Sequence, residues 1–134
     1  MDVERIRKFL LTLRFAEETC RDGKLVYWVG AKVLGGKMFA LLEIENQRTN
    51  GRERAPLISF SAGELYEELL NQQQFVKAPY LARARWVAVP LSSPTTFKQM
   101  TDLLRKAHEI TESKLPPNTK AHLWPGGKQK GKVG

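Results

Sequence analysis

The sequence is poor in the residues that crosslink chains and bind metals. Cys20 is its one cysteine, so an intrachain disulfide is impossible and a reducing compartment is the simple expectation. Its two histidines, His108 and His122, lie far from Cys20 in the sequence. A structural zinc site needs about four such ligands at close spacing. We therefore expect no metal site and no other cofactor.

Long hydrophobic runs are also absent. No apolar segment approaches the roughly 20 residues that a helix needs to span a bilayer. Residues 1–4 are acidic and do not show the pattern of a signal peptide. The 134 residues fit one domain that can bury a core without crosslinks. The sequence thus predicts a cytoplasmic protein with no membrane partner, and a monomer is favoured.

Catalytic motifs are lacking as well. Five residues separate Gly30 from Gly36, whereas the Walker motif has four between its glycines, and Met38 replaces the hydroxyl residue that binds magnesium. No serine lies in a Gly-x-Ser-x-Gly motif. A catalytic triad would depend on His108, which has no evident orienting partner in the sequence. We predict that the protein is not an enzyme and has no small-molecule substrate.

Negative charge is absent from the end of the chain. All 14 acidic residues lie at or before Glu112. Residues 1–113 hold 17 basic and 14 acidic side chains, a net +3, whereas the rest carries +5. Residues 118–134 lack apolar periodicity and predict a disordered basic tail, which either attracts polyanions or only aids solubility. The lysines that follow the last acidic residue are Lys114, Lys120, Lys128, Lys130 and Lys132.

Residues 25–61 predict three antiparallel strands at the centre of the fold. Apolar and β-branched residues mark strands at 25–34, 37–45 and 56–61. The pair Gly35-Gly36 predicts a two-residue hairpin turn, because both central positions need a positive φ. By strand alternation, one face of the middle strand carries Met38, Ala40, Leu42 and Ile44.

Helical periodicity flanks these strands. A first helix, capped by Asp2, is expected to end near residues 22–23. Ser61 and Glu64 have the spacing of a capping box and predict a short helix after the third strand. Ser93 with the proline that follows it predicts the start of a last helix, ended by two prolines at 116–117. That helix has an apolar face formed by Phe97, Met100, Leu104 and Ala107.

A further strand is predicted at residues 85–91. Trp86 and Val87 should point to opposite faces of the sheet. We expect Trp86 to be largely buried between the sheet and the last helix, near Phe97 or Met100. The competing interpretation is an exposed Trp86 that stacks on a nucleic-acid base.

Basic residues are the remaining functional signal. They crowd the polar loop at 46–54 and the approach to Trp86, and arginine on loops is one way in which proteins grip nucleic-acid phosphates. The competing interpretation is a charged loop that keeps a hairpin tip soluble, helped by the interspersed Glu53. The candidate DNA-binding residues are Lys37, Arg48, Arg52, Arg54, Lys77, Arg83 and Arg85.

Three sequence blocks occur in a characteristic order: VLGGKMFALL at 33–42, KAPYL at 77–81 and RWVAV at 85–89. They resemble the small bacterial MmcQ/YjbR proteins over roughly residues 3–115. The resemblance implies a CyaY-like α/β (α+β) fold, an antiparallel sheet with helices on one side, in a single domain at 1–117. It also implies DNA binding through a double wing, and it offers no catalytic residues.

The resemblance has two departures, one of which is the lysine-rich segment after Pro117 that looks like an addition, and it leaves an alternative open. Family members often have Leu-Pro near the end of the first helix, and residues 13–17 lack that proline, so a longer first helix is expected. The leading hypothesis is a non-enzymatic protein that binds DNA weakly. The alternative is a protein-interaction module or a frataxin-like metal-handling module. Frataxins bind iron through an acidic ridge, whereas the first helix here mixes acidic and basic residues.

Overall fold

The computed structural model describes residues 2–44, 56–78 and 81–123. Its centre is a sheet of six strands in the order β1-β2-β3-β4-β6-β5, and every neighbouring pair is antiparallel. The strands are β1 (Ala16–Arg21), β2 (Lys24–Val29), β3 (Lys37–Glu43), β4 (Leu57–Ser61), β5 (Val76–Lys77) and β6 (Trp86–Pro90).

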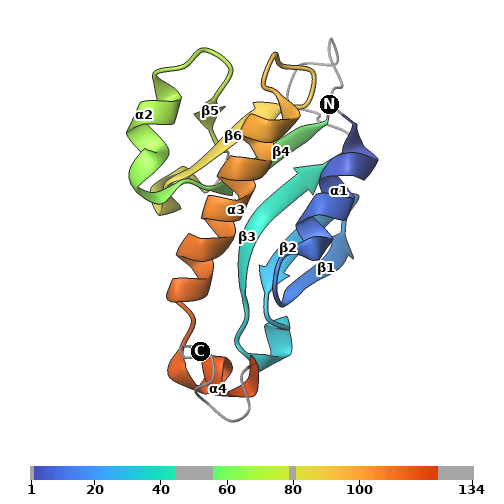
Figure 1. Cartoon of the computed structure of the whole chain (residues 1–134), viewed down its shortest axis with the longest axis vertical. Helices are drawn as coiled ribbons and strands as arrows, with labels where there is room; N and C mark the ends of the chain where they lie inside the picture. Colours follow the sequence, from blue (N-terminus) through green and yellow to red (C-terminus); the bar gives the residue numbers. More distant parts are fainter. Residues whose placement is uncertain (1, 45–55, 79–80, 124–134) are drawn as a thin grey trace.

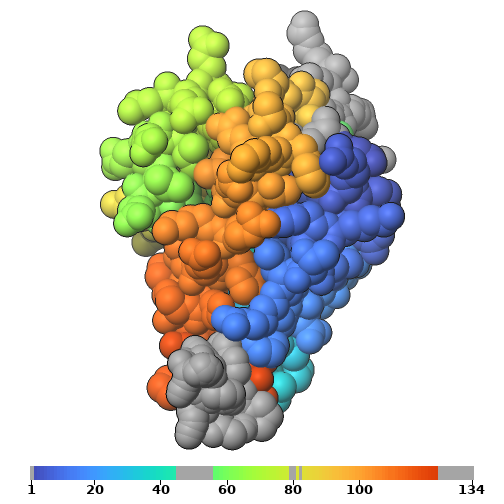
Figure 2. Space-filling view, in the orientation of Figure 1, coloured from blue at the N-terminus to red at the C-terminus, as the bar shows by residue number. Residues whose placement is uncertain are grey.

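Helices α1 and α3 lie side by side across one face of the sheet (Figure 1). Figure 2 shows the side chains of both helices meeting over that face. This arrangement confirms the predicted α+β fold. None of the helices in the described ranges is long and apolar enough to cross a bilayer. The helices are α1 (Val3–Thr12), α2 (Tyr66–Leu70), α3 (Phe97–Ser113) and α4 (Pro117–Leu123), with short 3-10 turns η1 (Lys32–Leu34), η3 (Gly63–Leu65) and η4 (Ala82–Ala84).

The main core lies between the sheet and these two helices. The predicted apolar stripe of α1 supplies Ile6 and Leu10, and that of α3 supplies Met100 and Leu104, all fully buried. Burial of these side chains holds both helices on the sheet. A second, smaller cluster contains buried Leu57, Ala78, Trp86 and Ala88, with Met38, Leu41 and Leu81 packed against it.

The alternation predicted for the strand at 85–91 is confirmed in β6. Val87 joins the main core, whereas Trp86 and Ala88 join the second cluster, so the two clusters occupy opposite faces of the sheet. Trp86 is buried, as predicted. Its predicted neighbours are wrong, because Met100 belongs to the main core and Phe97 packs against that core.

The first helix is shorter than predicted. Asp2 caps α1 as expected, accepting a hydrogen bond of 3.3 Å from a backbone N–H, but the helix ends at Thr12. Phe15 then takes a positive φ of 61°, and strand β1 follows. The two-residue hairpin turn is formed by Asp22 and Gly23, both with positive φ, between β1 and β2. The polar residues of β1 form an exposed edge strand, which gave no apolar alternation to detect.

The connection from β2 to β3 is a longer loop than the predicted glycine hairpin. Residues 30–36 include η1, and Gly35 has φ 91°, where an added Cβ would collide with the Thr119 side chain. The Thr119 hydroxyl donates a 2.8 Å hydrogen bond to the carbonyl of Leu34. Residues 118–123, assigned from the sequence to a disordered tail, form most of α4 and pack against this loop.

Strand β3 carries a bulge that changes which side chains share a face. Tyr27 pairs with Ala40 and Trp28 pairs with Met38, so Phe39 is the extra residue in β3. Met38 is therefore turned away from Ala40 and packs in the second cluster. The prediction that both residues share one face is wrong for this reason.

Two predicted helix caps are also wrong. Ser61 ends β4 in a strand conformation, and Ala62 occupies the cap position of η3 without a side-chain hydrogen bond. The cap of α3 is Thr96, whose hydroxyl accepts a 3.0 Å hydrogen bond from the backbone N–H of Gln99. Ser93 instead donates a hydrogen bond to a neighbouring threonine in the preceding turn.

Candidate anion-binding cleft

The sheet is open between the beginning of β3 and the ends of β4 and β6. Pairing of β3 with β4 covers only Ala40–Glu43, so residues 37–39 have no partner in β4. On the other side of this gap, Ser61 at the end of β4 pairs with Trp86 of β6. The bulge in β3 turns Met38 toward the second cluster, to which Trp86 also belongs.

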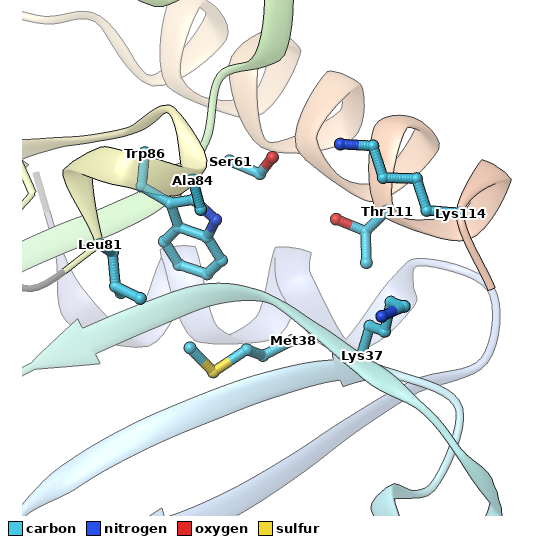
Figure 3. Close-up of a pocket in the computed structure, with 8 residues that line it drawn as sticks. All are labelled: Lys37, Met38, Ser61, Leu81, Ala84, Trp86, Thr111 and Lys114. Atoms are coloured by element: carbon cyan, nitrogen blue, oxygen red, sulfur yellow. The ribbon is translucent and has the colours of Figure 1, made fainter. Parts of the chain in front are cut away.

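A cavity of about 320 Å³ lies at this gap (Figure 3). This volume is at the lower end of the roughly 300–1,000 Å³ that ligand sites occupy. Segments far apart in the sequence meet there: β3, β4, the turn around η4, β6 and the last part of α3. The cleft is lined by Lys37, Met38, Ser61, Leu81, Ala84, Trp86, Thr111 and Lys114.

Three polar groups inside the cleft have no hydrogen-bond partner within the described part of the chain. They belong to Ser61, Thr111 and Trp86, which are 6%, 5% and 5% exposed. In Figure 3 the indole nitrogen and the Thr111 hydroxyl oxygen point toward the space between the labelled side chains, and the Ser61 hydroxyl lies at its edge. None of these atoms is sealed from solvent, because no completely buried side-chain nitrogen or oxygen in the described residues is unpartnered. Water or a ligand in the cleft can therefore bond to all three.

Two ammonium groups border the cleft. Lys37 begins β3, and Lys114 is the C-cap residue of α3, where its backbone N–H donates to the carbonyl of Thr111. Both side chains are exposed, and among the described residues neither has an ion-pair partner. Their charges are therefore available to an anion that enters the cleft.

The turn at η4 adds two arginines beside the lining residue Ala84. Arg83 and Arg85 are both exposed. Arg85 has φ 63°, its carbonyl accepts a 2.9 Å hydrogen bond from the N–H of Ala62, and its guanidinium lies 5.6 Å from the centre of the Tyr66 ring. The turn is thus tied to the end of β4.

The structure places the predicted DNA-binding residues unevenly. Lys37 lines the cleft, Arg83 and Arg85 flank it, and Lys77 is exposed on the edge strand β5. The sequence did not single out Ser61, Thr111 or Lys114 as site residues. No sequence signal marks them, because the gap between strands creates the cleft. Arg48, Arg52 and Arg54 lie outside the described residues.

A second polar cluster joins α1 to the first hairpin. The guanidinium of Arg7 donates two hydrogen bonds to the carboxylate of Glu18, at 2.8 and 2.9 Å, and the Tyr27 hydroxyl donates a third at 2.6 Å. The hydrogen bond from Arg7 holds the pKa of Glu18 below its ordinary value. Burial, followed by the hydrogen bond to Glu18, raises the pKa of Tyr27. These groups bind one another, so the cluster is structural.

His108 is a packed residue. It is 5% exposed, and its ring meets that of Phe39 edge-on at 5.3 Å between centroids. Its Nε2 lies 2.7 Å from the carbonyl oxygen of Arg14, an acceptor, so this nitrogen carries the proton. Within the described ranges, no group of three or more histidine, cysteine, aspartate or glutamate side chains could hold a metal ion.

Two solved structures share this fold. The Deinococcus radiodurans protein DR2400, with a DUF419 domain, matches at TM-score 0.73 and 24% identity, over 90% of this chain and 86% of that one. The Pseudomonas syringae structural-genomics target PsR293 matches at TM-score 0.66 and 18% identity, over 83% and 99% of the two chains. At these identities the likeness shows the fold alone. No family model and no curated protein matches the sequence.

Proposed function

We propose that this protein binds DNA at the cleft, weakly and with little dependence on base sequence. The observation that carries the proposal is that Lys37 and Lys114 line one cleft, with the exposed Arg83 and Arg85 on either side of its lining residue Ala84 in the chain. These cations come from separate elements, and the two lysines lack an ion-pair partner in the described part of the chain. The sequence resemblance to MmcQ/YjbR proteins, which implies a non-enzymatic DNA-binding role, supports the same function.

The chemistry of the opening favours phosphate contacts over base reading. Ammonium and guanidinium groups on an exposed rim bind phosphate oxygens, which carry no sequence information. The exposed face of α3, the longest helix, is occupied by ion pairs of Asp102 with Lys98 and Arg105, at 3.0 and 3.4 Å. That face offers few free donors for a DNA groove. Non-specific contacts of this kind give a Kd on the order of 10⁻⁴ to 10⁻⁶ M at physiological salt.

Among the described residues, no group of metal-binding side chains supports the alternative of a frataxin-like metal-handling module. A protein-interaction role has one observation in its favour. The turn η1 exposes Val33 by 90% and Leu34 by 42%, and α4 holds this turn in place. Apolar side chains fixed at an exposed turn suit contact with another protein. The patch has only two members, so we rank this function second.

Salt dependence of DNA binding tests the main proposal. In the full chain, changing Lys128, Lys130 and Lys132 to Gln removes C-terminal charge that would mask DNA binding at the cleft. Fluorescence anisotropy with a short labelled duplex should then give an affinity that falls steeply with salt. Changing Arg83 and Arg85 to Gln should reduce the log–log slope by about 1.8 units, because each phosphate contact contributes about 0.9.

The matched control changes Lys8 and Arg21, exposed cations of α1 and β1, to Gln. The control should leave the slope of the lysine-depleted protein nearly unchanged. An equal loss of slope in both double variants would show general charge attraction in place of a site. If the lysine-depleted protein does not bind duplex at low salt, the proposal is wrong.

A further inference from the structure

The cleft is too small for a double helix to enter. Its volume of about 320 Å³ suits one small group, so duplex DNA gripped at the rim would leave the interior unused. Ser61, Thr111 and the indole of Trp86 would then remain without protein partners, although each residue is more than nine-tenths buried. Their convergence on one small cavity indicates a ligand that enters it.

The polar groups of the cleft are mostly hydrogen-bond donors. The two ammonium groups and the indole N–H can only donate, and the two hydroxyls can donate or accept. None of the described residues that line the cavity carries a carboxylate. The complement of such a set is an anion with several acceptor oxygens. A terminal phosphate monoester carries about −1.5 to −2 charges at neutral pH, which matches the two lysines.

One wall of the cleft is apolar. Met38, Leu81 and Ala84 line it, and the first two also pack in the second cluster. A methionine side chain adapts to flat or irregular ligand surfaces. The Trp86 ring is itself packed in that cluster, so its N–H, rather than its face, is presented to the cavity. A ligand that complements both the polar and the apolar side of the cleft has a phosphate at one end and a compact, weakly polar group at the other.

We propose that the cleft binds a nucleoside monophosphate group. Its phosphate lies between Lys37 and Lys114, within reach of the hydroxyls of Ser61 and Thr111. Its base or sugar lies against Met38 and Leu81. The group can come from the phosphorylated end of a DNA strand, a source that rests on the proposed DNA binding, or from a free nucleotide, a source that does not.

Calorimetric titration of the full chain with thymidine 5′-monophosphate tests the inference, with thymidine and inorganic phosphate as the matched probes. The monophosphate should bind at least about tenfold more tightly than either probe, because each lacks one half of the complementary chemistry. Equal binding of monophosphate and thymidine would overturn the phosphate assignment. Equal binding of monophosphate and inorganic phosphate would overturn the nucleoside assignment.

Variants locate the site. Changing Lys37 and Lys114 together to Gln should weaken monophosphate binding about tenfold or more. Thr111→Val should weaken it several-fold, and Thr111→Ser, which keeps the hydroxyl, should restore it. Changing Lys8 and Arg21 to Gln controls for net charge and should leave the affinity nearly unchanged. If the lysine pair in the cleft and this control pair give the same affinity, the inference is wrong.

The source of the ligand is distinguished by oligothymidylates of about eight nucleotides, a length within the range of single-strand sites. A 5′-phosphorylated strand that binds about tenfold more tightly than its 5′-hydroxyl counterpart supports the strand end. Monophosphate binding without this discrimination supports the free nucleotide. Duplex binding without monophosphate binding overturns the inference and leaves the proposed function intact. Monophosphate binding without duplex binding upholds the cleft and removes the proposed function.

Discussion

The polar groups between α1 and the first hairpin are paired with one another, whereas those lining the cleft are not. In the first region, Glu18 accepts hydrogen bonds from Arg7 and from the buried Tyr27. In the second, Ser61 and Thr111 are more deeply buried than Glu18, but their hydroxyls have no hydrogen-bond partner in the described residues. The two regions lie on opposite sides of β3, within one sheet.

This difference separates polar groups that stabilise the fold from polar groups that are open to water or a ligand. A buried polar group that is paired inside the protein contributes modestly to stability, and its loss is costly. A buried polar group that faces an open cavity contributes little to stability, because water already satisfies it. Substitutions at the paired cluster should therefore change unfolding, and substitutions inside the cleft should change binding.

Trp86 belongs to both groups, because it supports the fold and also lines the cleft. Its ring fills the second cluster while its N–H faces the cleft. Trp86→Ala should reduce the free energy of unfolding by about 3–5 kcal/mol, measured by urea denaturation. Trp86→Phe keeps most of the ring and should cost much less, yet it removes the indole donor. A Trp86→Ala protein of nearly normal stability would show that the ring does not support the second cluster.

Helix α4 should stabilise the loop that precedes Lys37. Thr119 bonds to Leu34, and Leu123 packs against the main core. A chain that ends at residue 117 should therefore lose about 2 kcal/mol of stability, with a fall of several degrees in Tm. A chain that ends at residue 123 is the control, and it should melt close to the full chain. Equal melting of both shortened chains would show that α4 contributes nothing to stability.

The contribution of Glu18 to stability should depend on pH. Glu18→Gln should cost about 1 kcal/mol at neutral pH, because it weakens the hydrogen bond from buried Tyr27. The folded-state pKa of Glu18 lies below its unfolded value, so the carboxylate's contribution is fully present above pH about 4.5. That contribution should disappear as the pH falls through the lower, folded-state pKa. Denaturation at pH 7 and at successively lower pH should show the wild type and variant converging.

A matched substitution in the cleft completes this test. Thr111→Val removes the hydroxyl of a residue that is more buried than Glu18, but the unfolding free energy should change by less than about 0.5 kcal/mol. Loss of stability from Thr111→Val comparable with that from Glu18→Gln would show that the Thr111 hydroxyl is structural.

Sequence periodicity was sufficient to predict most of the fold. The apolar stripes of α1 and α3 and the alternation in β6 follow from one-sided burial, which leaves a regular pattern in the sequence. The exposed edge strand β1 has no buried face to create such a pattern, so it was assigned to the first helix. The bulge at Phe39 was not detectable, because a single extra residue reverses the faces without changing the composition.

The candidate site was predicted only in part, for a different reason. Lys37, Arg83 and Arg85 could be chosen because charge in loops is visible in the sequence. Ser61 and Thr111 are ordinary residues near the ends of a strand and a helix, 50 positions apart in the numbering. Both line the cleft, which lies where the pairing of β3 with β4 ends, next to the bulge. A site made by a gap between strands leaves no local motif.

The smallest effect on stability is expected at Arg48, Arg52 and Arg54, which lie outside the described residues. If these arginines bind DNA as the sequence suggests, changing all three to Gln should reduce the log–log salt slope by up to about three units, since each contact contributes about 0.9. The measurement belongs in the background with Lys128, Lys130 and Lys132 changed to Gln. The melting temperature should stay within the error of the parent protein, because the substitutions remove charge and no core side chain. A reduced slope in the triple variant, together with an unchanged slope in the Arg83 and Arg85 double variant, would assign DNA binding to residues 46–54 and not to the cleft.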